Sequence, residues 1–123
     1  MTQEELIAYC LTLPGAYEDH PFESLPAGND WTAMRHRGGK KTFVFFHERQ
    51  GALWVNVKCE PEFAEVLRKT YESVVPGYHM NKTHWNSVIC GGDVSDEKLC
   101  EMVRYSFELT APKKRVKAVQ ARK

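Results

Sequence analysis

The 123-residue sequence lacks the patterns that mark several common protein classes. No apolar run approaches the ~20 residues that a transmembrane helix needs. The N-terminal residues are acidic and lack the basic start and apolar run of a signal peptide. Internal repeats and low-complexity tracts are also absent. Because 42% of the residues are apolar and 27% are charged, as is usual for globular proteins, we expect a single cytoplasmic domain with its own core.

The motifs of several enzyme and metal-binding classes are missing as well. The sequence has no glycine-rich dinucleotide or phosphate loop, no GxSxG elbow, no HExxH helix and no EF-hand loop. The four cysteines form no CxxC pair, and their gaps match no zinc framework. Adjacent carboxylates such as Glu4 and Glu5 point to different faces of a helix and make poor acid–base partners. We therefore assign no catalytic residue, no metal site and no cofactor.

Start and stop signals predict three helices. Thr2 and Glu5 form a capping box for the first helix, and the Pro-Gly pair at 14–15 ends it. The second helix starts at Pro61, because proline is favoured in the first turn. Ser95 can cap the third helix. Each helix carries apolar residues at helical spacing, which indicates one buried side.

Strands are predicted over 31–37, 42–47 and 53–59, with a fourth that ends near Cys90. The first three are joined by links of hairpin length, so they are antiparallel. The segments 16–30 and 74–86 are predicted to be irregular. The resulting fold class is α+β: an antiparallel sheet with helices packed on one face.

The predicted strands differ in how their side chains alternate. The run 42–47 is nearly all apolar and is predicted to be a buried central strand. The run 53–59 alternates strictly, so Trp54, Asn56 and Lys58 share one face and point away from the core. An outer row that offers an aromatic ring, an amide and a cation together is unusual.

The net charge of +1 is the difference between two unlike segments. Residues 1–111, the predicted α+β domain, contain 16 acidic and 11 basic residues, a net charge of −5. Residues 112–123 contain six basic and no acidic residues. This basic tail could attract a polyanion by counterion release. The alternative is a flexible, solvated terminus that aids solubility.

A second basic cluster surrounds the Gly-Gly pair at 38–39. Four cations flank this turn: Arg35, Arg37, Lys40 and Lys41. On a hairpin they would form a positively charged wing that could lie along a phosphate backbone. The alternative is a charged hairpin tip that faces solvent and binds nothing.

The segment 76–86 is the richest in polar and aromatic side chains. Its candidate binding residues are Tyr78, His79, Asn81, Lys82, His84 and Trp85. Aromatic rings can stack on bases, a lysine can bind an anion and a histidine can carry a proton. The alternative is a rigid loop whose rings cover the sheet edge while its polar groups satisfy the backbone. Sequence alone leaves both interpretations open.

Three segments together resemble a known family. They are 9–22 (YCLTLPGAYEDHPF), 57–62 (VKCEPE) and 75–87 (VPGYHMNKTHWNS), and they are similar to the MmcQ/YjbR family of small bacterial proteins. The resemblance extends to about Thr110 and leaves out the basic tail. It implies a frataxin-like (CyaY-like) α+β fold and DNA binding through a double-wing motif.

We therefore predict a small non-enzymatic nucleic-acid-binding module, with DNA as its partner. Arg35, Arg37, Lys40, Lys41 and Lys58 would contact phosphates, and the 78–85 motif would supply polar and stacking contacts. We expect a monomer that does not bind membranes. The first alternative is a small-molecule or anion-binding protein, which could be an enzyme, with a pocket built from the Tyr78–Asn86 motif. The second is an adaptor for a protein partner. A pocket requires the motif side chains to converge, whereas a DNA binder requires wing and motif to share one positive face.

Overall fold

The computed structural model describes residues 1–21, 31–39 and 41–112. In chain order the elements are α1 (Gln3–Leu11), β1 (Ala16–Asp19), β2 (Thr32–His36), β3 (Thr42–Arg49), β4 (Ala52–Lys58), α2 (Pro61–Thr70), β5 (Val74–Pro76), β6 (Trp85–Ile89) and α3 (Asp96–Thr110). Within these residues the strands form a six-stranded sheet of order β1-β2-β3-β4-β6-β5. Lys40 of the predicted wing and residues 113–123 of the predicted tail lie outside the described residues.

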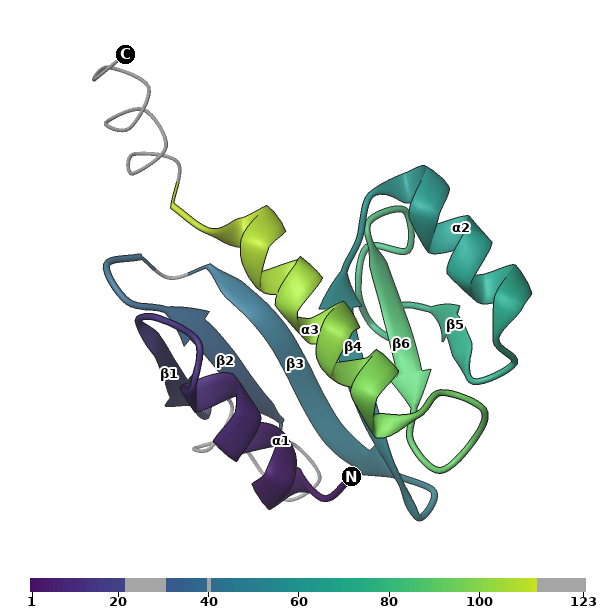
Figure 1. Ribbon diagram of the computed structural model, residues 1–123, viewed down its shortest axis with the longest axis horizontal. Coiled ribbons are helices and arrows are strands. Elements are labelled where there is room, and N and C mark those ends of the chain that lie inside the picture. The colour runs from purple at the N-terminus through teal and green to yellow at the C-terminus, as the bar shows by residue number, and fades with distance from the viewer. Residues whose placement is uncertain (22–30, 40, 113–123) are drawn as a thin grey trace.

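All neighbouring strands of the sheet are antiparallel. The helices lie on one side of the sheet, with α1 over β1 and β2, α3 over β3 and β4, and α2 beside β5 and β6 (Figure 1). This arrangement confirms the predicted α+β class. None of the helices in the described ranges is long and apolar enough to cross a membrane.

Two short strands lie in segments that the sequence predicts to be irregular, so that prediction was wrong there. Strand β1 pairs with β2, with Tyr17 opposite Arg35, and β5 pairs with β6, with Val75 opposite Ser87. Both are edge strands of three or four residues. Each pairs with the next strand along the chain across a loop that is too long to carry a hairpin-turn signal, so the local pattern does not reveal the pairing. Pro76 in β5 is tolerated because an edge strand need not donate every N–H.

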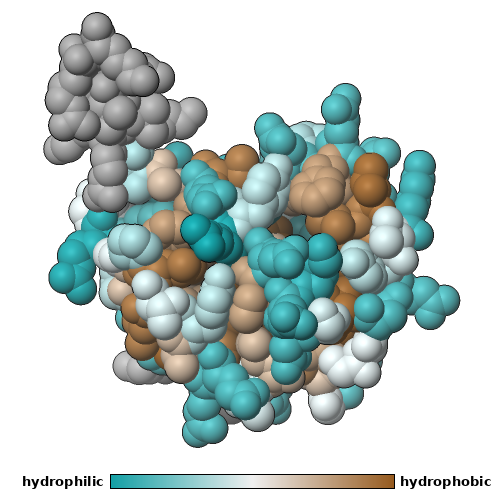
Figure 2. Space-filling view, viewed as in Figure 1, coloured by the Kyte–Doolittle hydropathy of each residue, from teal (hydrophilic) through white to brown (hydrophobic). Residues whose placement is uncertain are grey.

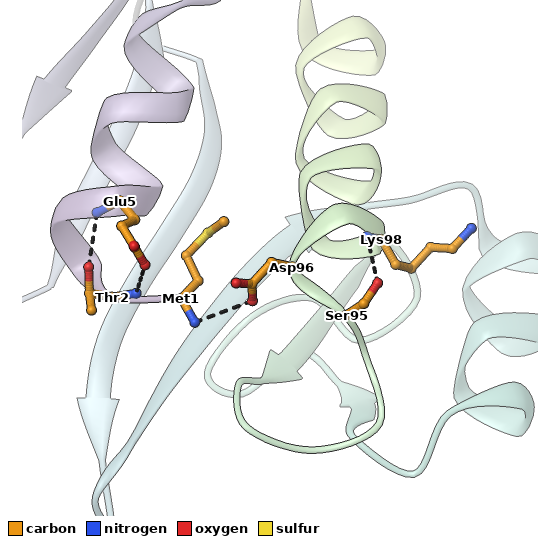
Figure 3. Close-up of polar contacts among 6 residues, drawn as sticks. All are labelled: Met1, Thr2, Glu5, Ser95, Asp96 and Lys98. Carbon is orange, nitrogen blue, oxygen red and sulfur yellow. Dashed lines mark hydrogen bonds and ion pairs between the residues drawn. The ribbon is translucent and has the colours of Figure 1, made fainter.

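The helix starts agree with the predicted caps (Figure 3). The Thr2 hydroxyl accepts the Glu5 N–H at 3.1 Å, and the Glu5 carboxylate accepts the Thr2 N–H at 2.9 Å. The Ser95 hydroxyl accepts the amide N–H three residues further on, at 3.1 Å. The Met1 amino group lies 3.3 Å from the Asp96 carboxylate. This last contact ties the chain just before α1 to the first turn of α3.

The core lies between the sheet and the helices. The predicted alternation of β4 is confirmed, because Leu53, Val55 and Val57 are buried on the helix side. The apolar stripe of α2 is buried only in part. Polar side chains cover much of the helix-covered surface, and apolar ones gather over α2 (Figure 2), where Phe63 is 43% exposed and Val66 is 54% exposed.

A register shift between β2 and β3 determines which β3 side chains point toward the helices and which point away from them. Met34 pairs with Val44, but the next residue, Arg35, pairs with Thr42. Phe43 is therefore an additional residue of β3, and both Phe43 and Val44 are fully buried. Beyond this bulge the side chains alternate, so the strand predicted to be buried on both sides presents Phe45 and other side chains away from the helices.

His36, at the end of β2, is buried beneath the last turns of α3. Its ring lies 4.4 Å from the Phe107 ring, and its Nε2 lies 2.7 Å from the Thr110 hydroxyl. Burial lowers the pKa of His36 below its ordinary value of 6.5, the Phe107 backbone partly offsets this, and the charge of Lys41 lowers the pKa further. The fold therefore favours the neutral ring.

A pH titration of stability tests this arrangement. The unfolded chain takes up a proton at His36 near pH 6.5, whereas the folded chain does so only at lower pH. Stability from this residue is therefore complete above pH 6.5 and is lost as pH falls toward the lower folded pKa. We expect the free energy of unfolding to fall between about pH 7.5 and about pH 5, and to fall less in His36→Leu. Urea denaturation at both pH values measures the difference. His84→Gln, an exposed control, should keep the full decrease; an unchanged decrease in His36→Leu would contradict the assignment.

Candidate functional site

The side of the sheet opposite the helices carries all three tryptophans of the chain. We call this side the helix-free face. The strand register and side-chain contacts place these residues on it: Trp31, Ala33, Arg35, Thr42, Phe45, His47, Arg49, Trp54, Asn56, Lys58, Trp85 and Ser87. Its larger rings are half-buried. A half-buried ring is held by its neighbours and still presents part of its surface to solvent, where a ligand can contact it.

Three rings stack along the helix-free face. The Trp31 and His47 rings are nearly parallel, with centroids 3.9 Å apart and an interplanar angle of 20°. The Tyr78 ring continues the stack, at 5.8 Å and 19° from His47. Trp54 lies against Tyr78, with centroids 5.6 Å apart. The loop residue Tyr78 is thus part of the surface of the sheet.

Phe45 connects this stack to the third tryptophan. Its ring meets Trp31 edge-on, with centroids 6.3 Å apart, and lies 6.1 Å from Trp85 on the other side. The rings therefore run across the sheet from the start of β2 to the start of β6. The Trp31, Phe45 and Trp85 rings are half-buried and held by their neighbours, so little rotamer freedom remains to be lost on binding.

A buried polar row crosses the middle of the face. Asn56 is fully buried, and its amide donates to the Phe45 carbonyl at 3.2 Å. The Ser87 hydroxyl donates to the Asn56 side-chain oxygen. The same hydroxyl oxygen accepts the Tyr78 N–H at 2.8 Å. These bonds satisfy the buried amide and fix Tyr78 to the sheet.

Cations lie at both ends of the ring surface. The Arg49 guanidinium lies over the Trp54 and Tyr78 rings, 4.9 and 4.3 Å from their centroids. Lys58 lies at the opposite end of β4. Arg35 bonds Asp19, with Nε 2.8 Å from the carboxylate. The strand residues that the structure describes on this face therefore include three cations and one carboxylate.

The loop between β5 and β6 is fixed from the opposite side of the sheet by Arg68 of α2. Its guanidinium donates to the Asn86 side-chain oxygen at 2.6 Å and to the Trp85 carbonyl at 3.2 Å. It also donates to the carbonyl of Lys82. Gly77 is required at the start of the loop, because an added Cβ would lie 2.8 Å from the Trp85 Cβ. The loop is therefore a rigid element.

The structure divides the predicted motif residues into two groups. Tyr78 and Trp85 contribute rings to the helix-free face. The other four, His79, Asn81, Lys82 and His84, are exposed on the loop. The Lys82 amine donates to the Gly77 carbonyl at 3.0 Å. The six side chains are therefore not brought together into one cavity.

The predicted wing residues are also divided. Arg35 bonds Thr42 on the helix-free face, with Nη1 2.8 Å from the hydroxyl. Lys41 is exposed, and its charge lowers the pKa of His36. Arg37 is exposed at the turn, where its N–H donates to the Gly15 carbonyl at 2.7 Å. Of these residues, Arg35 is the one whose side-chain contacts place it on the helix-free face.

Sequence reasoning missed four residues of the face: Trp31, Phe45, His47 and Arg49. The bulge at Phe43 hides the alternation that would have separated Phe45 and His47 from the core. Arg49 belongs to a segment that the sequence predicts to be a hairpin connection, whereas β3 continues through it. The outer row of β4 and the motif residues Tyr78 and Trp85 were the signals in the sequence that lie on this surface.

Two cysteine thiols, which could act as nucleophiles, are buried in the core. Burial raises the pKa of Cys10 to about 12 and the pKa of Cys59 to about 11. Both therefore stay protonated and weakly nucleophilic at neutral pH. Within residues 1–21, 31–39 and 41–112, no group of three or more His, Cys, Asp or Glu side chains is placed to hold a metal ion.

Comparison with known proteins defines the class to which this fold and surface belong. The YjbR family model matches residues 11–109. The chain therefore belongs to the YjbR family, as its three motifs predict.

Individual relatives cover most of the chain. The Escherichia coli K12 protein YjbR is 32% identical over 108 residues, which cover 88% of this chain and 86% of YjbR. Bacillus subtilis YyaQ is 28% identical over 120 residues, covering 89% and 98% of the two chains. The solved structure of Deinococcus radiodurans DR2400 has a TM-score of 0.79 and 30% identity, covering 91% of this chain and 80% of that one. A crystal structure of a Pseudomonas syringae protein has a TM-score of 0.76 and 27% identity, covering 89% and 99%.

Replacing Arg68 tests whether the loop is rigid. Arg68→Leu removes the donor to the buried Asn86 oxygen and to two loop carbonyls. We expect the free energy of unfolding to fall by about 2 kcal/mol. Lys69→Leu, an exposed change on the same helix, should cost less than about 0.5 kcal/mol. Urea denaturation measures both, and equal costs would show that Arg68 does not hold the loop.

Proposed function

We propose that the protein binds nucleic acid through the helix-free face. The observation that carries the proposal is the coincidence on one face of all three tryptophans with cations at both ends of the strands. Proteins that bind nucleic acids combine these two kinds of group: cations contact the phosphates, and rings stack on bases. The double-wing DNA binding implied by the family resemblance supports the same class of partner.

The spacing of the groups suits this role. Trp54 and Lys58 are four residues apart on β4, which places them about 13 Å from each other at roughly 3.3 Å per residue. The rings thus lie between the Arg49 end and the Lys58 end of the strand. A backbone that follows β4 would meet a cation at each end, with its bases over the rings.

The charge of the domain limits where a polyanion can bind. Residues 1–111 carry a net charge of −5, which repels phosphate at long range. Binding therefore requires a locally positive surface. Among the described strand residues of the helix-free face, three cations and one carboxylate give a net charge of +2. Arg37, exposed at the β2–β3 turn, would extend the contact.

Binding is a better proposal than catalysis. Burial keeps the Cys10 and Cys59 thiols protonated, and the polar motif side chains spread over a loop instead of converging around a reacting group. What the face does offer is rings and cations held in place by packing and hydrogen bonds. These groups recognise a ligand without changing it.

Charge removal tests the proposal. We expect Arg49→Gln combined with Lys58→Gln to weaken the binding of a fluorescently labelled DNA oligonucleotide. The slope of log affinity against log salt should become shallower by about 1.4 to 1.8, because each lost phosphate contact contributes about 0.7 on a single strand and about 0.9 on a duplex. Fluorescence anisotropy over a range of salt concentrations measures both quantities.

The matched control removes two cations from the helix-covered side. Lys98→Gln with Arg104→Gln produces the same net charge, and both residues belong to α3. This variant should keep the wild-type slope. If both double variants lose the same affinity, binding depends on overall charge and the helix-free face is not the site. If the wild-type protein binds neither single-stranded nor duplex DNA, the proposal is wrong.

A further inference from the structure

We propose that the ligand of the helix-free face is single-stranded nucleic acid, whose unpaired bases stack on the rings of Trp31, Phe45 and Trp85. This inference rests on the proposed function and specifies its substrate class. It follows from the kind of surface that the rings form, from their arrangement and from the small number of charges around them.

The first argument concerns which part of a nucleic acid the face can contact. Its dominant groups are aromatic rings, which gain most from contact with the flat face of a base. In a duplex these base faces are covered by neighbouring base pairs, and only edges and phosphates are accessible. Unpaired bases expose their faces and can be spread over a protein surface. A surface of rings therefore matches a single strand better than a duplex.

The second argument concerns the arrangement of the rings. Trp31 and Trp85 lie on opposite sides of Phe45, whose ring contacts both. From β2 through β3 and β4 to β6, the sheet extends about 14 Å, at roughly 4.8 Å per strand. This distance accommodates several bases side by side. A sheet whose face carries aromatic side chains is an established way of presenting rings to successive bases.

The third argument concerns charge. The described strand residues of the face include three cations, and one of them, Arg35, bonds the Asp19 carboxylate. A protein that holds duplex DNA mainly through phosphates commonly uses six to ten such contacts, an order-of-magnitude guide. With so few cations, phosphate contacts alone would give weak duplex binding. Stacking on half-buried rings supplies the additional affinity only when the bases are unpaired.

A comparison of probes tests the inference on the full-length protein. The probes are fluorescein-labelled oligothymidylate of about 12 nucleotides, a ribo-oligouridylate of the same length and a duplex of about 12 base pairs, lengths chosen from typical single-strand site sizes. We expect at least about tenfold tighter binding of the single strands than of the duplex, the equivalent of about 1.4 kcal/mol. Tight binding of either single strand supports the inference. The difference in affinity between oligothymidylate and oligouridylate shows whether the ligand is DNA or RNA.

Ring variants locate the effect. Trp85→Leu should weaken oligothymidylate binding about tenfold and leave the slope of log affinity against log salt unchanged, because stacking releases no counterions. Phe63→Leu removes an aromatic ring that is 43% exposed on α2 and should bind as the wild type does. Saturable quenching of the wild-type tryptophan fluorescence by oligothymidylate gives the same information without a variant, since all three tryptophans lie on this face.

The outcomes distinguish this inference from the proposed function. If the duplex binds as tightly as the single strands, and the Arg49–Lys58 double variant loses affinity while Trp85→Leu does not, the single-strand inference is overturned and nucleic-acid binding by this face stands. If no probe binds, both fall. If Phe63→Leu weakens binding as much as Trp85→Leu does, stacking on the helix-free face is rejected.

Discussion

The buried amide of Asn56 imposes the constraint on which the helix-free face depends. A polar side chain that is fully excluded from water must find its hydrogen bonds within the protein. Asn56 finds them in the Phe45 carbonyl of β3 and the Ser87 hydroxyl of β6. Because the same hydroxyl accepts the Tyr78 N–H, the amide that joins three strands also holds the loop against the sheet. The ring stack depends on that position.

Arg68 acts on the same loop from the other side of the sheet. Its bonds to the Asn86 side chain and to the Trp85 carbonyl hold the end of the loop where it enters β6. The loop is thus fixed to the sheet by Ser87 and to α2 by Arg68. A site built on such supports needs little reorganisation to bind a ligand, which favours affinity. The exposed polar residues of the loop are therefore less informative about the site than the buried ones that position it.

The sequence predicted those parts of the fold that local chemistry determines. The Thr2–Glu5 capping box, the cap at Ser95 and the alternation of β4 each depend on neighbouring residues, and the structure has them as predicted. Strands β1 and β5 could not be predicted in this way, because each is three or four residues long and pairs with its neighbour across a loop without a hairpin-turn signal. The extra residue Phe43 interrupts the alternation of β3, so the sequence did not show that Phe45 and His47 point away from the helices. The sequence therefore pointed to Tyr78 and Trp85 but missed the stack that begins at Trp31 and the cation at Arg49.

The central claim is that the helix-free face is the binding surface, and the three tryptophans can report on it directly. Each indole N–H gives its own signal in a ¹⁵N-correlated NMR spectrum, and the backbone amides of α3 report on the helix-covered side at the same time. On titration with oligothymidylate, the signals of Trp31, Trp54 and Trp85 should shift together and saturate, while those of α3 stay in place. Shifts that concentrate on α1 and α3 and leave the three indoles unchanged would contradict the account.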